Sequence, residues 1–138
     1  MKEVILLYNI RDEKSRGFLS SICDAHQIEL KHVSPEESSV PLGFLAYGTD
    51  EQKAPYMADD RSGQDIDHPD QTQKERFPGE PMIIFAGFTN PRLTMMLDLL
   101  KVNKLASPSL KAVLTEFNAV WDSMTLYEQL TEERARFI

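Results

Sequence analysis

The sequence predicts an α/β protein in which two β-α-β-α halves form one four-stranded, mainly parallel sheet of order 2-1-3-4 with flanking helices. Two strongly apolar, strand-length runs are each followed by a helical pattern with one apolar face. A weaker, alternating run follows each helix, as an edge strand would. Because this succession occurs twice, we expect one compact domain built from two similar halves.

The first half comprises residues 1–47. Val4–Ile10 is a nearly continuous apolar run, typical of a central strand covered on both faces. Asp12 is placed to cap the following helix, whose apolar residues recur at intervals of three and four. Alternation over Ile28–Val33 predicts an edge strand, and a shorter helix is expected at Pro41–Tyr47.

The second half comprises residues 82–138 and repeats this pattern. Met82–Phe88 is another apolar strand, and Asn90-Pro91 reads as an N-cap followed by proline at the first helical position. Leu110–Thr115 predicts an alternating strand. Thr125 and Glu128 have the spacing of a capping box, which predicts a final helix.

Residues 48–81 differ in composition from both halves. From Asp50 to Glu80 there are nine acidic and four basic residues, a local charge of −5 out of the total −7. Glycine and proline are frequent and large apolar residues are few. The segment is therefore expected to be an acidic polar linker or a mobile loop.

An offset of 78 residues (82 − 4) matches Val4 with Met82 and Asp12 with Asn90. Four more residues then match Ile28 with Leu110. In an all-parallel sheet of order 2-1-3-4, a crevice opens between the first and third strands at their carboxyl ends. Two halves related by a pseudo-twofold axis would instead make these strands antiparallel, which removes the crevice. The sequence leaves both arrangements open.

Composition excludes several classes of protein. A hydrophobic content of 41% and a charged content of 27% are ordinary for a globular domain, and no apolar segment is long enough to span a membrane. A net charge of −7 argues against nucleic-acid binding, which relies on clustered Lys and Arg. The single cysteine, Cys23, agrees with a reducing compartment, so a cytoplasmic location is expected.

The stretch LKAVLT-x-x-N-x-x-W, which begins at Leu110, resembles the bacterial family of domain of unknown function 3783. The resemblance covers roughly Met82 to Arg134 and includes Leu126, Glu128 and Leu130. It implies a bacterial origin and a candidate site, and it implies neither an activity nor a cofactor.

Within this motif Thr115, Asn118 and Trp121 follow the last predicted strand, where α/β sheets often place ligand-binding groups. The more ordinary interpretation is that Asn118 orders a turn while Trp121 anchors it to the core. Lys111 on the same strand could meet an anion, although it is more often a solvated charge of an edge strand.

A second candidate site combines polar residues that follow the first and third strands, with two helix N-termini supplying N–H groups to a small anionic ligand. Its members are Asn9, Arg11, Asp12, Thr89, Asn90 and Arg92. Capping by itself explains Asp12 and Asn90, and the site requires the crevice of an all-parallel sheet.

Apolar residues of the helix 91–103 span an arc of about 220°, more than one sheet face requires. Either a neighbouring helix covers the remainder, or Met95, Leu99 and Val102 face a second copy of the chain in a homodimer. Cys23 and His26 lie one helical turn apart, but no second pair of ligands accompanies them, so no metal site is expected.

Three functional hypotheses follow. The first is a non-enzymatic binding or regulatory module that contacts an unknown protein partner and forms a homodimer through the helix 91–103. The second is a small-ligand protein for a nucleotide or another anion. The third is an enzyme of unrecognised type, for which no catalytic residue is assigned because no known catalytic motif occurs.

Overall fold

The computed structural model describes residues 2–57, 80–102 and 110–136. The chain divides into two compact units, neither of which coincides with a half of the sequence. Met1–His32 and Glu80–Leu114 make up the first, which we call the sheet unit. Val33–Gly79 and Thr115–Ile138 make up the second, which we call the helical unit. Each half of the sequence therefore contributes to both units.

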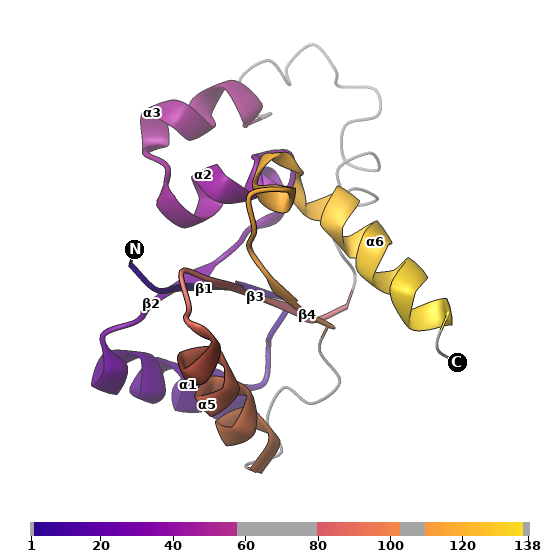
Figure 1. Cartoon of the computed structure of the whole chain (residues 1–138). Coiled ribbons are helices and arrows are strands. Elements are labelled where there is room, and N and C mark those ends of the chain that lie inside the picture. Colours follow the sequence, from indigo (N-terminus) through magenta and orange to yellow (C-terminus); the bar gives the residue numbers. More distant parts are fainter. Residues whose placement is uncertain (1, 58–79, 103–109, 137–138) are drawn as a thin grey trace. The chain divides into compact units, whose positions relative to one another are not determined.

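The sheet unit contains β1 (Val4–Tyr8), β2 (Glu29–His32), β3 (Met82–Ala86) and β4 (Leu110–Val113) (Figure 1). Their order in the sheet is β2-β1-β3-β4, which confirms the order expected from the sequence. The pairs β1–β2 and β3–β4 are parallel, and the central pair β1–β3 is antiparallel. All five residues of β1 and of β3 are buried, as their continuous apolar runs predicted.

The antiparallel central pair resolves the alternative that the sequence left open. Val4 lies opposite Ala86 and Tyr8 lies opposite Met82. The carboxyl ends of β1 and β3 therefore lie at opposite edges of the sheet. The crevice expected between parallel carboxyl ends does not form, because that crevice needs both strands to run in one direction.

The pseudo-repeat is visible in the backbone. The offset of 78 residues places β1 onto β3, and the residue directly after each strand has a positive φ, 60° at Asn9 and 80° at Gly87. For the second strands the predicted match is wrong by one residue. Val4 pairs with Glu29 as Met82 pairs with Leu110, so Glu29 rather than Ile28 corresponds to Leu110.

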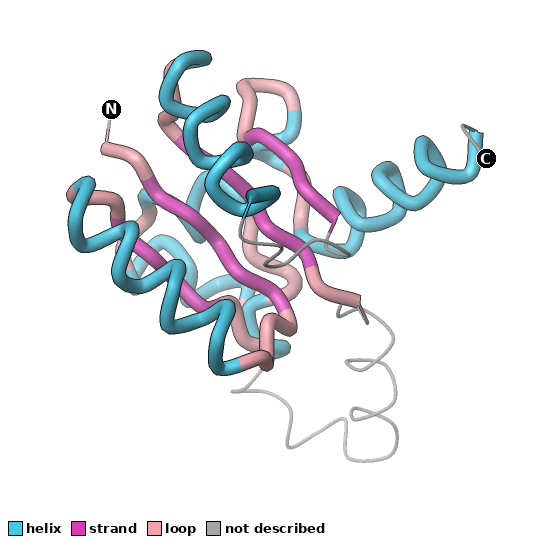
Figure 2. Tube along the Cα trace, turned by 90° about the horizontal axis from the view of Figure 1, so that it is seen from below, coloured by secondary structure: helices cyan, strands magenta, loops and turns pink. Residues whose placement is uncertain are grey.

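Helices α1 (Glu13–His26) and α5 (Asn90–Val102) pack on the same face of the sheet (Figures 1 and 2). Alternate residues of β1 and β3 face them. The buried core of this layer consists of Ile5, Leu7, Ile10, Leu19, Cys23, Ile28, Ile83, Phe85, Met96 and Leu100. The expected apolar stripe of α1 is thus confirmed at Leu19 and Cys23, one helical turn apart.

The predicted caps are confirmed in one case and displaced in two. The carboxylate of Asp12 accepts hydrogen bonds from the backbone N–H of Ser15 at 3.0 Å and from its hydroxyl at 2.6 Å. For α5 the cap is Thr89 rather than Asn90, because the N–H of Arg92 donates to Thr89 Oγ1 at 3.4 Å. For α6 the cap is Asp122 rather than Thr125, whose own N–H donates to Asp122 Oδ1 at 2.9 Å.

The helical unit consists of short helices and one longer one. From the first half come the 3₁₀ helix η1 (Pro35–Glu37), α2 (Leu42–Tyr47), α3 (Asp50–Lys53) and the 3₁₀ helix η2 (Ala54–Tyr56). From the second half come the 3₁₀ helix η4 (Asn118–Val120) and α6 (Ser123–Arg136). Over the described residues no helix has the length and apolarity needed to cross a membrane.

The expected linker 48–81 begins with helical structure, because α3 and η2 follow α2 directly. Thr49 caps α3 in a reciprocal pair with Gln52: the backbone N–H of each residue donates to the side-chain oxygen of the other, at 2.9 and 3.1 Å. The spacing T-x-x-Q is a capping-box signal that the sequence carries. Residues 58–79 of the expected linker lie outside the described part of the chain.

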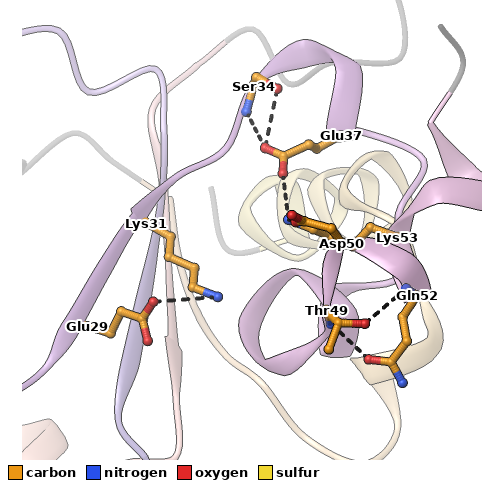
Figure 3. A network of polar contacts seen from close by, with 8 residues as sticks. All are labelled: Glu29, Lys31, Ser34, Glu37, Thr49, Asp50, Gln52 and Lys53. Carbon is orange, nitrogen blue, oxygen red and sulfur yellow. Dashed lines mark hydrogen bonds and ion pairs between the residues drawn. The ribbon is translucent and has the colours of Figure 1, made fainter.

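Figure 3 shows how Lys53 at the end of α3 contacts Glu37 in the 3₁₀ helix η1. Its Nζ lies 3.3 Å from Glu37 Oε2 and 3.9 Å from Asp50 Oδ1. The other carboxylate oxygen of Glu37 accepts the N–H of Ser34 at 3.0 Å. Glu37 therefore caps η1 and at the same time connects it with α3.

Replacing glycine by alanine is expected to have opposite effects on stability at two positions. Gly17 is exposed within α1, and an added Cβ would meet no atom within 4 Å, so Gly17→Ala should raise the free energy of unfolding by about 0.5–1 kcal/mol. At Gly48 the Cβ would lie 2.7 Å from the Phe44 carbonyl oxygen, so Gly48→Ala should lower it by about 1–3 kcal/mol. Urea unfolding followed by circular dichroism measures both changes; equal stability of the two variants would contradict the local geometry.

Candidate functional site

The motif recognised in the sequence forms a compact turn between β4 and α6. The N–H of Thr115 donates to Asn118 Oδ1 at 2.8 Å, and the N–H of Asn118 donates to Thr115 Oγ1 at 3.2 Å. Two backbone bonds continue the turn, from Ala119 N to Thr115 O and from Trp121 N to Asn118 O, both at 3.0 Å. Asn118 is buried, so its side-chain oxygen satisfies a donor where water has little access.

The backbone of this turn is also attached to the first part of the helical unit. The carbonyl of Trp121 accepts the N–H of Leu42 at 2.8 Å, and the N–H of Ser123 donates to Ser38 O at 3.2 Å. A Cβ added at Gly43 would lie 3.3 Å from both the Cβ and the carbonyl oxygen of Ala119. The absence of a side chain at Gly43 thus allows α2 to approach η4 closely.

Thr115, Asn118 and Trp121 therefore lie in one turn, and the hydrogen bonds of Asn118 match the ordinary interpretation that this residue orders it. Trp121 is half-buried, and the anchoring of the turn to the core by its side chain stays a prediction. Ligand binding by these residues stays a prediction. The turn has a second property, however. Phe117 is 85% exposed and Val120 is 76% exposed, the first and third highest values among large apolar residues of the described chain.

The two exposed side chains project in the same direction. Phe117 has helical φ and ψ of −71° and −46°, and the 3₁₀ helix η4 follows it. In a 3₁₀ helix with three residues per turn, side chains at positions i and i+3 are eclipsed. Phe117 and Val120 consequently form one exposed apolar pair on the hydrogen-bonded turn. We call this pair, with the turn that carries it, the Phe117–Val120 turn.

The sequence-based search missed Phe117 and Val120. The available signal was their position: two large apolar residues stand between a strand and a capped helix, in a segment without the periodicity of either element. Such residues commonly anchor a loop to the core, and only the tertiary structure decides whether they are buried anchors or exposed side chains.

Lys111, the other candidate of the motif, lies on β4 in the sheet unit. It pairs in register with Ile83, whose side chain belongs to the core under α1 and α5, so Lys111 lies on the same face of the sheet. Burial lowers the pKa of Lys111 below its ordinary value of 10.5, because desolvation disfavours the charged ammonium.

The polar cluster predicted at the strand ends is not assembled at one place. Asn9 and Arg11 follow β1, whereas Thr89, Asn90 and Arg92 follow β3, and the antiparallel pairing sends these strands to opposite edges. The left-handed conformation of Asn9 also has a structural reason, because asparagine tolerates a positive φ better than most residues. One ligand could contact the residues after β1 and those after β3 together only if these two strands were parallel.

Arg92 is engaged by the sheet unit itself. Its Nε and Nη2 donate to the two carboxylate oxygens of Glu3 at 3.0 and 2.7 Å, a bidentate pair. Nη2 also donates to the backbone oxygen of His26 at 3.2 Å. The pair joins the start of α5 to the residue before β1 and to the end of α1. The guanidinium of Arg92, through its hydrogen bonds, holds the pKa of Glu3 below its ordinary value of 4.5.

The residues expected at a homodimer contact differ in exposure. Met95 and Leu99 are partly buried and pack against the core of their own sheet unit, whereas Val102 is 77% exposed. Part of the broad apolar arc of α5 is thus accounted for within one chain. A homodimer through this helix stays a prediction.

Cys23 is buried in the core of the sheet unit, and burial raises the pKa of its thiol to about 11. A thiol with this pKa is a poor nucleophile near neutral pH, because the thiolate is the reactive form. Within the described ranges no three His, Cys, Asp or Glu side chains are grouped so as to hold a metal ion.

The described residues define a protein with an α/β sheet unit of two parallel β-α-β crossovers and a helical unit that carries an exposed apolar turn. Residues 81–137 match the family model described as a domain of unknown function (DUF3783), which confirms the resemblance seen in the motif. The matched segment contains the whole Phe117–Val120 turn. Searches of curated proteins and of solved structures found no match.

Asn118 should contribute measurably to stability. Asn118→Ala removes a buried acceptor from the N–H of Thr115 and should lower the free energy of unfolding by about 1–3 kcal/mol. Thr115→Ser keeps the hydroxyl that accepts from Asn118 and serves as the matched control, with a small expected change. If urea unfolding shows both variants to be as stable as the wild type, the hydrogen bonds do not hold the turn.

The ion pair of Glu3 with Arg92 is expected to make the stability of the folded chain fall on acidification. Its pKa is lowered in the folded state, so its contribution is complete above the ordinary value of 4.5 and disappears as the pH falls through the folded value. Glu3→Gln should therefore be less stable than the wild type at neutral pH, and the difference should shrink as the pH falls below 4.5 and through the lowered folded-state pKa. Thermal unfolding across this range measures it. Asp98→Asn, at an exposed carboxylate of α5, is the control, and a difference independent of pH would contradict the ion pair.

Proposed function

We propose that this chain is a non-enzymatic binding module that acts through protein–protein contacts, and that the Phe117–Val120 turn is its contact. The observation that carries the proposal is the exposure of two neighbouring apolar side chains, 85% and 76%, on a turn held by four hydrogen bonds. Single exposed apolar residues are common on protein surfaces, whereas an eclipsed pair that includes phenylalanine is a candidate anchor.

The energetics of such a contact are favourable for binding. Removing the Phe117 side chain from water would contribute about 1.5–3 kcal/mol. Aromatic residues dominate the energetic centre of many interfaces. Because Thr115 and Asn118 already order the turn, little conformational entropy remains to be lost when a partner binds.

Loss of the apolar pair should abolish partner capture. The full chain with an affinity tag is incubated with lysate of its native host, and the captured proteins are quantified by mass spectrometry. We expect Phe117→Ala combined with Val120→Ala to reduce the proteins specifically captured by about tenfold or more, the factor that corresponds to 1.4 kcal/mol.

The matched control is Val102→Ser, which removes a comparably exposed apolar side chain (77%) from the sheet unit. This variant should capture the same proteins as the wild type. Urea unfolding of each variant verifies that the chain stays folded. Equal capture by the wild type and the double variant would contradict the proposal.

A further inference from the structure

The formal charge of the chain is divided unequally between its two units. By sequence, the sheet unit has nine Lys and Arg against seven Asp and Glu, a net charge of +2. The helical unit has six against fifteen, a net charge of −9. The unit that carries the Phe117–Val120 turn thus accounts for all of the net negative charge of the chain.

The described surface of the helical unit shows the same imbalance. Over residues 33–57 and 115–133, seven carboxylate side chains are exposed and no Lys or Arg side chain is. They are Glu36, Asp50, Glu51, Glu116, Glu128, Glu132 and Glu133. Lys53, the one Lys or Arg in these ranges, is half-buried and lies 3.3 Å from a carboxylate oxygen of Glu37.

One of these carboxylates is immediately next to the exposed apolar pair. Glu116 precedes Phe117 and both side chains are exposed. A segment that buries Phe117 must therefore approach Glu116, and on a surface of net negative charge it would be attracted if it were positively charged. Nucleic acids and anionic membranes would be repelled by the same surface.

Resting on the proposed function, we infer that the Phe117–Val120 turn binds a protein segment rich in Lys and Arg that also carries apolar residues. The apolar pair supplies the anchor for its apolar side chains. The exposed carboxylates of the helical unit attract its positive charges and favour it over acidic competitors.

Two synthetic peptides test this inference. They share the same leucine and alanine positions, and one has lysine wherever the other has glutamate. Binding of each fluorescently labelled peptide to the full chain is measured by anisotropy. The fluorescence of Trp121, the single tryptophan of the sequence, reports independently on the turn.

We expect the lysine peptide to bind, the glutamate peptide not to bind, and binding to weaken with added salt. Phe117→Ala with Val120→Ala should weaken lysine-peptide binding by about tenfold or more, as should Glu116→Lys. Asp98→Lys makes the same charge change at an exposed site of the sheet unit and should leave binding unchanged. Equal binding of the lysine peptide to the wild type and to the Phe117/Val120 variant would overturn the inference.

The outcomes separate this inference from the proposed function. If capture from lysate depends on Phe117 but is insensitive to salt and to Glu116→Lys, the turn is a protein contact and its partner is not basic. If capture does not depend on Phe117, the proposed function fails whatever the peptides show. A dimer in light scattering that Phe117→Ala abolishes would make a second copy the occupant and overturn the basic partner.

Discussion

The antiparallel pairing of β1 with β3 is the interaction on which the rest of the sheet unit depends. It joins the two β-α-β crossovers into one sheet with two apolar strands at its centre, although β3 begins 50 residues after the end of β2. The pseudo-twofold relation between the crossovers leaves α1 and α5 on one face, where they share a core. The same pairing sends the carboxyl ends of the central strands to opposite edges, so this sheet lacks the ligand crevice that doubly wound parallel sheets have.

A second constraint operates locally in the turn after β4. Thr115 and Asn118 satisfy each other's backbone N–H groups, and α2 provides a further backbone contact through Leu42. This support determines the position of Phe117 and Val120 although neither side chain is buried. Exposing two apolar side chains forgoes the stabilisation that their burial would bring. The proposed protein contact would recover it in the complex, and the neighbouring Glu116 together with the excess of exposed carboxylates on the helical unit would select the charge of the partner.

Much of the fold could be predicted because its signals are local. The continuous apolar runs of β1 and β3, the cap at Asp12 and the Asn118 turn all depend on residues close in sequence. Two predicted helix caps are wrong by a few residues, and both errors have the same cause. Thr89 rather than Asn90 caps α5, and Asp122 rather than Thr125 caps α6. Neighbouring residues of similar capping ability cannot be ranked without knowledge of the backbone conformation. The capping box T-x-x-Q at Thr49 was missed for a different reason, because it lies in an acidic, proline-rich segment that was expected to be a linker or loop.

By itself the sequence determined the number, kind and order of the main elements, the repeated layout and the family motif, because hydrophobic periodicity and capping residues act over a few positions. Tertiary structure decided the direction of β1 against β3, the engagement of Arg92 by Glu3, and the exposure of Phe117 and Val120. These features depend on contacts between residues distant in sequence, such as Glu3 and Arg92. Whether an apolar side chain is covered depends on every element that packs around it, which no single stretch of sequence records.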